Sequence, residues 1–207
     1  MAAADGGDRG RLTLVPHFTR TELESFRGVE VADLVGDGIR LVFVGINPGL
    51  RTAATQIHFG NPGNRFRPAL VGAGILAPAV GGVPGMTEDD LAELVRRGVG
   101  ITNLVRRATA RADELTAPEL VEGAGRLESF VTTHRPRVVA VLGITAYRIA
   151  FARPRATPGR QPDGLAGAAL WVVPNPSGLN AHETVASLAT AYAEPARAAG
   201  VVPVGAG

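Results

Sequence analysis

The chain has 207 residues, of which 45% are hydrophobic and 19% are charged, and its formal net charge at pH 7 is +2. This length is enough for one globular domain with a sizeable core, and so small a net charge does not by itself indicate nucleic acid as the partner. The complete absence of cysteine excludes disulfides, cysteine nucleophiles, thiolate zinc sites and iron–sulfur clusters.

The sequence gives no sign of a metal, cofactor or membrane site. The four histidines are spaced neither with one another nor with carboxylates as metal ligands are, so we expect no catalytic metal and no cofactor. No apolar run approaches the roughly eighteen residues of a membrane span, and no apolar signal segment is found among the N-terminal residues. We therefore expect a cytoplasmic protein that is neither inserted in a membrane nor secreted.

Composition predicts one domain flanked by two tails. Residues 1–14 are rich in alanine, glycine and charge, which is typical of a disordered tail. We expect a single domain over residues 15–200 and a flexible C-terminal tail over residues 201–207. At the start of the domain, a capping-box pattern over residues 19–22 predicts a short helix over residues 20–27.

Buried strands alternate with helices along the domain. The apolar run at residues 41–45 predicts a buried strand, and residues 50–69 predict a loop with a short helix from Asn64, because they show no clean period. Pro195 is expected to kink or end the last helix. The other predicted elements are strands over residues 99–105, 138–142 and 170–174, helices over residues 87–98, 118–134, 145–151 and 183–199, and a loop over residues 152–168 with room for one edge strand. This alternation predicts an α/β fold, a three-layer α/β/α sandwich around a short, mainly parallel central sheet.

Two of the predicted strands end in the same kind of turn. Asn-Pro-Gly at residues 47–49 follows the first strand, and Asn-Pro-Ser at residues 175–177 follows the last one. Open α/β sheets bind ligands at the carboxyl ends of their strands, so the two turns are predicted to face one cleft. Asn47 is the first polar side chain presented there.

These turns belong to the motifs GINPGL at residues 45–50 and NPSGLN at residues 175–180. Further matching segments are Phe59 and residues 64–66, 100–105 and 141–143. The whole set closely resembles the mismatch-specific uracil-DNA glycosylases, the Mug/TDG branch of the uracil-DNA glycosylase superfamily. The resemblance implies a uracil-DNA glycosylase-like fold and double-stranded DNA with a mismatched or damaged pyrimidine as the partner, and we expect a monomer.

The activity implied by this resemblance is excision of uracil from G:U or G:T mismatched DNA, with related damaged pyrimidines such as ethenocytosine, or weakly thymine, as further substrates. The base must be flipped out, because it cannot be reached inside a duplex. All 21 basic residues are arginine. Strand cleavage through a Schiff base needs an amine, usually that of lysine, so unless the N-terminal amine served, the enzyme would be monofunctional.

The resemblance also implies residue roles. Asn47 would position the water that attacks the glycosidic carbon. An amide cannot accept a proton as a carboxylate can, so general-base catalysis should be missing and turnover slow. The implied base pocket consists of Gly45, Ile46, Phe59 and Asn175, and the implied phosphate and wedge contacts are Ser177, Gly178, Leu179 and Asn180.

A few positions depart from the family pattern, and one segment has two possible roles. Members often carry an aromatic residue where this chain has Arg67, and some carry arginine where it has Ala181 and His182. The arginine-rich run at residues 106–111 has two interpretations, phosphate contact or a solvated face.

Two other functions compete with a glycosylase. One is a relative that binds mismatched or abasic DNA but has little or no catalysis, which a slow asparagine-based site would favour. The other is a Rossmann-like binder of small nucleotides. Against the second, no G-x-G-x-x-G or Walker A loop follows any predicted strand.

Overall fold

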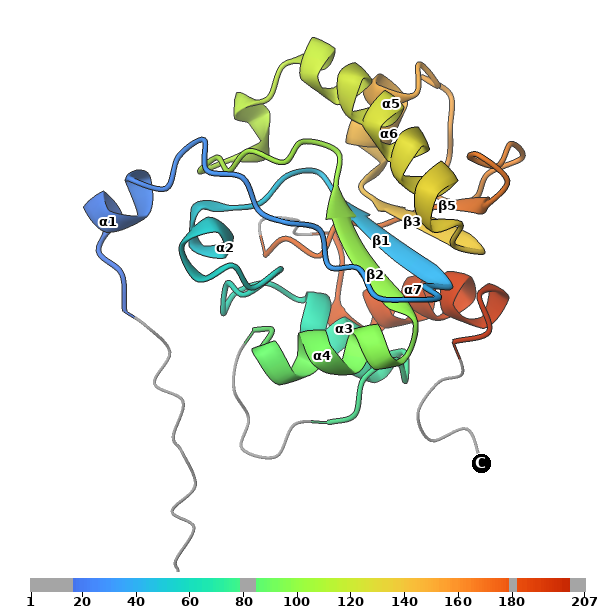
Figure 1. Cartoon of the computed structure of the whole chain (residues 1–207), viewed down its shortest axis with the longest axis horizontal. Helices are drawn as coiled ribbons and strands as arrows, with labels where there is room; N and C mark the ends of the chain where they lie inside the picture. Colours follow the sequence, from blue (N-terminus) through green and yellow to red (C-terminus); the bar gives the residue numbers. More distant parts are fainter. Residues whose placement is uncertain (1–16, 79–84, 179–181, 202–207) are drawn as a thin grey trace, which may run out of the picture.

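The computed structural model (Figure 1) describes residues 17–78, 85–178 and 182–201. They form a five-stranded sheet in the order β2-β1-β3-β5-β4. The strands are β1 (Leu41–Gly45), β2 (Val99–Asn103), β3 (Val138–Leu142), β4 (Gly159–Arg160) and β5 (Ala169–Val173). All neighbours are parallel except the edge strand β4, which runs antiparallel to β5. The carboxyl ends of the four parallel strands therefore lie along one edge of the sheet.

Helices cover both faces of this sheet (Figure 1). One face packs on α3 (Phe66–Gly72), α4 (Glu88–Arg96) and α7 (Val185–Ala198), and the other on α5 (Ala117–His134) and α6 (Ile144–Ala150). Every residue of β1, β2 and β3 is buried. As is typical of buried parallel strands, β1 and β3 are near-continuous apolar runs, whereas β2 ends in the buried polar residues Thr102 and Asn103. The predicted three-layer α/β/α fold is confirmed.

Smaller helices complete the described part of the chain. The short helices α1 (Arg20–Glu24) and α2 (Leu50–Thr55) pack against each other, and η1 (Ala112–Glu114) is a single turn of 3-10 helix. None of the helices in the described ranges is both long enough and apolar enough to cross a bilayer.

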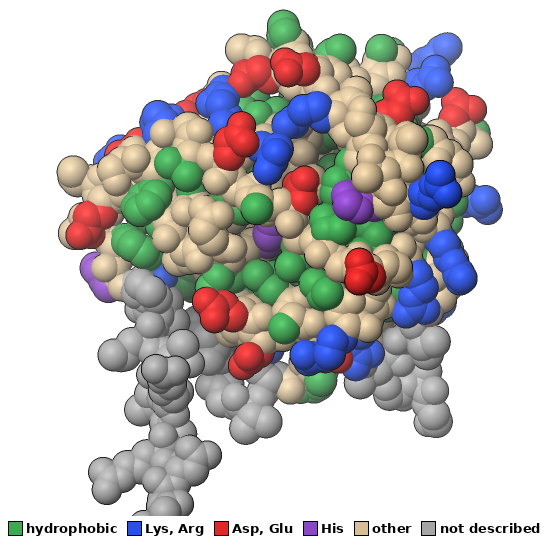
Figure 2. All heavy atoms as spheres, in the orientation of Figure 1, with side chains coloured by type: hydrophobic (Ala, Val, Ile, Leu, Met, Phe, Trp, Pro, Cys, Tyr) green, Lys and Arg blue, Asp and Glu red, His purple; other side chains and the backbone are tan. Residues whose placement is uncertain are grey.

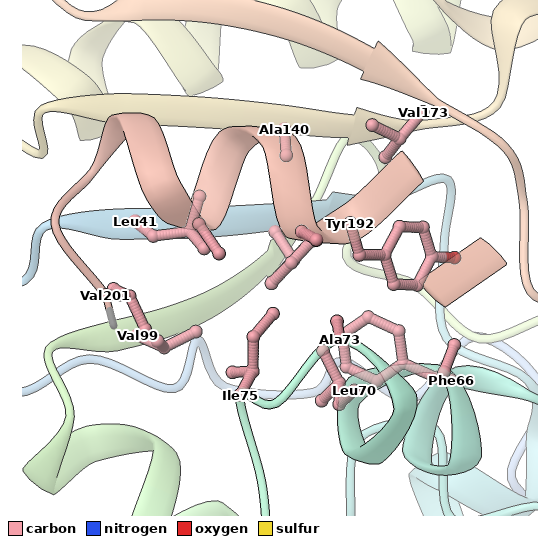
Figure 3. Close-up of a cluster of buried hydrophobic side chains, with 14 of the residues drawn as sticks. Leu41, Phe66, Leu70, Ala73, Ile75, Val99, Ala140, Val173, Tyr192 and Val201 are labelled. Carbon is pink, nitrogen blue, oxygen red and sulfur yellow. The ribbon is translucent and has the colours of Figure 1, made fainter. Parts of the chain in front are cut away.

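A cluster of aromatic side chains ties the sheet to two helices (Figure 3). Phe66 of α3 lies edge-on to Phe43 of β1, with ring centroids 5.3 Å apart, and Tyr192 of α7 packs against both rings. Figure 3 shows Phe66 and Tyr192 among the buried side chains of this core. The Tyr192 hydroxyl donates a hydrogen bond to the carbonyl of Pro174 at 2.9 Å, and burial raises the pKa of this hydroxyl. The cluster thus fixes the chain where it leaves β5, directly before Asn175.

The predicted loop at residues 50–69 contains more helix than expected. Helix α2 was missed because its N-cap is Gly49, which has no side chain to cap the helix, so the usual start signal is absent. The predicted helix from Asn64 is α3, which begins at Phe66, whose N–H donates to Asn64 Oδ1 at 2.8 Å. Helix α1 ends at Glu24 and β2 at Asn103, both earlier than predicted.

The C-terminal region also differs from the prediction. Helix α7 continues past Pro195 to Ala198. Pro195 is buried beside Tyr192 and Ala196, and we attribute the intact helix to this packing, which offsets the hydrogen bond that proline cannot donate. Val201 was assigned to the flexible tail but is buried in the core. Residues 202–207 and the predicted N-terminal tail lie outside the described residues.

Arg67, a departure from the family pattern, joins α3 to α4 through an ion pair. Its Nε and Nη2 donate to the two carboxylate oxygens of Asp90 at 2.7 and 3.1 Å, and each side chain is only 11% exposed. Asp90 also accepts hydrogen bonds from the backbone N–H and hydroxyl of Thr87, which caps α4. Burial raises the pKa of Asp90, but the hydrogen bonds from Arg67 and Thr87 outweigh it, so the pKa is lowered.

Removing Arg67 should destabilise the protein more than removing an exposed arginine. In Arg67→Leu, Asp90 stays largely buried without its cation, and we expect the free energy of unfolding at pH 7 to fall by about 2 kcal/mol. A depressed carboxyl pKa stabilises only above that pKa, so the difference from wild type should shrink as the pH falls through the lowered pKa of Asp90. Urea unfolding at several pH values measures this. Arg96→Leu is the control, because the Arg96 side chain is 67% exposed, and equal losses in the two variants at pH 7 would contradict this assignment.

Candidate functional site

The carboxyl ends of the parallel strands open onto a pocket of about 460 Å³. Its lining comes from the turn after β1, residues 58–64, the end of β2, residues 109–112 and the turn after β5. Segments far apart in the sequence meet here because parallel strands bring their carboxyl ends to one edge. The predicted residues that line it are Gly45, Ile46, Asn47, Phe59, Asn175, Ser177 and Gly178, whereas the predicted wedge residues Leu179 and Asn180 lie outside the described residues.

The Asn47 amide is held in one orientation. The two hydrogens of its Nδ2 are shared among Thr109 Oγ1, the nearest acceptor at 2.7 Å, and the carbonyls of Pro48 and Arg107, both at 3.2 Å. The single hydroxyl hydrogen of Thr109 is donated to the carbonyl of Arg111 at 2.7 Å, so this hydroxyl can only accept from Asn47. Asn47 Oδ1 makes no hydrogen bond to any described residue, which leaves it as an acceptor at the pocket.

Gly45 and Asn103 form the floor of the pocket. They are paired across β1 and β2, and a Cβ atom on Gly45 would lie 2.4 Å from Asn103 Oδ1, so any larger residue at position 45 would displace the Asn103 amide. Asn103 is 8% exposed, and within the described ranges no hydrogen-bond partner is found for its side chain. The Asn103 amide lines the open pocket and is not fully enclosed, so water or a ligand there can complete its hydrogen bonds. Asn103 is therefore available to a ligand, a role that the sequence did not assign to it.

An aromatic side chain and an imidazole form a further wall. Phe59 adopts a left-handed backbone conformation (φ 54°), and its ring packs against Phe66 at an interplanar angle of 30°, with centroids 4.0 Å apart. His58 is buried and its Nε2 lies 2.8 Å from the carbonyl of Ala32, to which it must donate. Burial lowers the pKa of His58, so the ring is neutral at pH 7 and Nδ1 is an acceptor. The wall thus carries no charge.

Arg65 connects the loop before α3 to the segment after β5. Its backbone N–H donates to the carbonyl of Pro176 at 3.0 Å, and its guanidinium donates to the carbonyls of Ser177 and Glu183. A Cβ atom on Gly178 would lie 2.8 Å from the carbonyl of Gly63, so the two backbones are in direct contact. One guanidinium thus holds both ends of the connection that contains the predicted wedge.

The turn after β5 has its own local order. Asn175 Oδ1 accepts a hydrogen bond from the backbone N–H of Ser177 at 2.9 Å, which is an Asx turn. Gly143, at the end of β3, faces the Asn175 side chain, because a Cβ atom there would lie 3.7 Å from Asn175 Nδ2. The second predicted asparagine therefore lies at the pocket with its oxygen turned toward its own loop.

The arginine-rich run at residues 106–111 is paired with carboxylates. Arg107 contacts Glu119 at 2.6 Å, and Arg111 contacts Asp113 at 2.6 Å. The hydrogen bond from Arg107, followed by those from Thr116, lowers the pKa of Glu119 to about 2. Acidic and basic side chains are likewise interspersed over much of the face in Figure 2. Arg107 and Arg111 are thus ion-paired, whereas Thr109 of the same run is buried and, like Arg111, lines the pocket, so the run is not simply a solvated face.

The polar lining suits an uncharged polar ligand better than a metal. No group of three or more histidine or acidic side chains that could hold a metal ion occurs within residues 17–78, 85–178 and 182–201. The pocket itself also lacks carboxylates, since no aspartate or glutamate is among the described residues that line it. The lining instead presents amides, hydroxyls, one neutral imidazole and Arg111, whose guanidinium is paired with Asp113.

A family model described as the Uracil DNA glycosylase superfamily matches residues 32–195. The match includes every segment that lines the pocket. Members of this superfamily are DNA glycosylases, hydrolases of DNA repair that bind DNA. Because the match spans well over half of the chain and the fold agrees with it, the chain belongs to the uracil DNA glycosylase superfamily.

Proposed function

We propose that this protein is a monofunctional glycosylase of the Mug/TDG type that excises uracil from G:U mismatches in double-stranded DNA. The observation that carries the proposal is the orientation of Asn47, whose Nδ2 is engaged by Thr109 so that Oδ1 is the acceptor at the pocket. Related damaged pyrimidines such as ethenocytosine, and thymine weakly, are further proposed substrates.

The geometry suits attack by a water molecule on the glycosidic carbon. As the bond breaks, the sugar becomes cation-like and the leaving uracil gains negative charge. Asn47 Oδ1 accepts a hydrogen from the water, which directs a water lone pair toward the sugar. Because an amide takes up no proton, and no carboxylate is found among the described lining residues, the water is oriented but not deprotonated. Turnover is therefore slow.

The other side chains of the pocket suit a pyrimidine. The edge of uracil alternates carbonyl acceptors with one N–H donor, and an amide such as Asn103 presents a matching donor and acceptor side by side. His58 Nδ1 is an alternative acceptor for this one N–H, and Phe59 offers an aromatic wall. These contacts support a flipped base in the pocket. Asn175 would contribute a further amide near the base.

The segment after β5 is the proposed contact to the DNA backbone and to the vacated stack. Ser177 would bind a phosphate, with Gly178 allowing close approach, while Leu179 and Asn180 would fill the gap left by the flipped base. Arg65 would keep this segment in register with the pocket, because its contacts bracket the segment on both sides. The absence of lysine supports release of the base without strand cleavage.

A second candidate is a mismatch- or abasic-DNA-binding relative with little or no catalysis. The lack of a carboxylate among the described lining residues favours it, because the site has no strong base. Tight binding to such DNA without release of a base would select this candidate.

The orientation of Asn47 gives the most direct test by mutation. Asn47→Ala should lower the single-turnover rate of uracil excision by about 100-fold, the order of effect seen when one oriented polar group of an active site is lost. Thr109→Val should lower it by about tenfold, because the amide is no longer held, while Thr109→Ser should restore most of the rate. Binding to the mismatched duplex should change little in all three variants. Near-normal excision in Asn47→Ala would contradict the proposed role of this residue.

Removing the Arg65 guanidinium should slow uracil excision more on duplex than on single-stranded substrates. Arg65→Gln leaves the carbonyls of Ser177 and Glu183 without their shared donor, and we expect about a tenfold slower excision from a G:U duplex. Excision from single-stranded DNA, which needs no wedge, should change less. Arg65→Lys should share the defect, because an ammonium lacks the planar fork that bridges two carbonyls. Equal losses on both substrates would contradict a role in holding the wedge segment.

A further inference from the structure

A second cavity, of about 510 Å³, lies between α6 and the loop that leads to β5. It is lined by Tyr147 of α6, by residues 152–157 and by residues 160–163. None of the described residues that line this cavity also lines the pocket at the strand ends. An inference about this cavity is therefore independent of the proposed glycosylase activity.

The cavity carries an excess of positive charge. Arg153, Arg155 and Arg160 line it together with a single carboxylate, Asp163, which gives a formal net charge of +2. Asp163 pairs with Arg153 at 3.0 Å. Within the described part of the chain, neither Arg155 nor Arg160 has a carboxylate within ion-pair distance. Two guanidinium groups are thus left for a ligand.

The loop around the cavity is held in a defined shape. Gln161 is 8% exposed, and its Nε2 donates to the carbonyls of Thr157 and Gly159 at 2.8 and 2.9 Å. Arg148 of α6 donates twice to the carbonyl of Ala156. The cavity is therefore built by hydrogen bonds, although its arginines reach into solvent.

Two residues that line the cavity, Arg160 and Tyr147, each pack against a neighbouring aromatic ring. The Arg160 guanidinium lies over the Trp171 ring, 5.4 Å from its centroid, across the β4–β5 pair. Tyr147 is stacked on Phe151 and is only 4% exposed, and its hydroxyl makes no hydrogen bond to any described residue. This hydroxyl lines the cavity and is not fully enclosed, so an acceptor atom of a ligand in the cavity can reach it.

We propose that this cavity binds a phosphate ligand. Arg155 and Arg160 would donate forked hydrogen bonds to the phosphate oxygens, and the Tyr147 hydroxyl would donate a further one. The volume of about 510 Å³ leaves room beside one phosphate group for a second phosphate or a sugar. Such a group can come from a nucleic-acid backbone or from a free diphosphate compound.

The only tryptophan of the chain provides a local probe. Pyrophosphate, titrated at constant ionic strength, should produce a saturable change in Trp171 fluorescence, because the ligand binds the Arg160 guanidinium that lies over this ring. Tyr147→Phe, which removes only the hydroxyl, and Arg155→Gln should each weaken the affinity by about tenfold, the order expected for one lost hydrogen bond to a charged group. Arg96→Gln, an exposed arginine of α4, should have no effect.

The proposal is overturned if no saturable change occurs at millimolar pyrophosphate, or if Tyr147→Phe/Arg155→Gln binds as well as wild type while unfolding at the same temperature. If pyrophosphate binds as expected, a competition experiment with a short duplex that contains no uracil identifies the source of the phosphate. If the duplex displaces pyrophosphate from wild type, the cavity binds a DNA backbone. If both bind at once, the ligand is a free phosphate compound.

Discussion

The hydrogen bond from Asn47 to Thr109 is the contact on which the pocket depends. An amide can be turned either way, and in one orientation it presents a donor and in the other an acceptor. Because Thr109 has already donated its hydrogen to the carbonyl of Arg111, only the orientation with Nδ2 toward Thr109 is satisfied. The oxygen of Asn47 is thus directed to the pocket by a neighbour 62 positions along the chain.

The rest of the fold holds this arrangement in place. Parallel pairing of β1 with β2 brings Asn103 over Gly45, and the aromatic cluster around Phe66 supports both Phe59 and the chain after β5. Arg65 then joins the two loops at the rim. A site without carboxylates among its described lining residues relies on such fixed geometry, because orientation is the main contribution that amides can make to catalysis.

The sequence predicts the sheet better than the pocket. Strands β1 and β3 coincide with the predicted ranges, because a buried parallel strand is recognisable as a continuous apolar run. The two Asn-Pro turns likewise follow directly from their strands. Asn103, Thr109 and Arg65 were not identified, because their roles arise from partners distant in sequence, such as the carbonyls that Arg65 reaches 112 and 118 positions away. Helix α2 was missed because Gly49 provides no capping side chain.

The most direct test of the proposed activity is single-turnover release of base from a labelled G:U duplex, beside A:U and single-stranded uracil substrates, followed by alkali. We expect abasic sites to form fastest on the G:U duplex and strand breaks to appear only after alkali. Breaks without alkali would contradict a monofunctional enzyme. No abasic sites under enzyme excess would contradict the proposed activity and favour a protein that binds such DNA without cleaving the glycosidic bond.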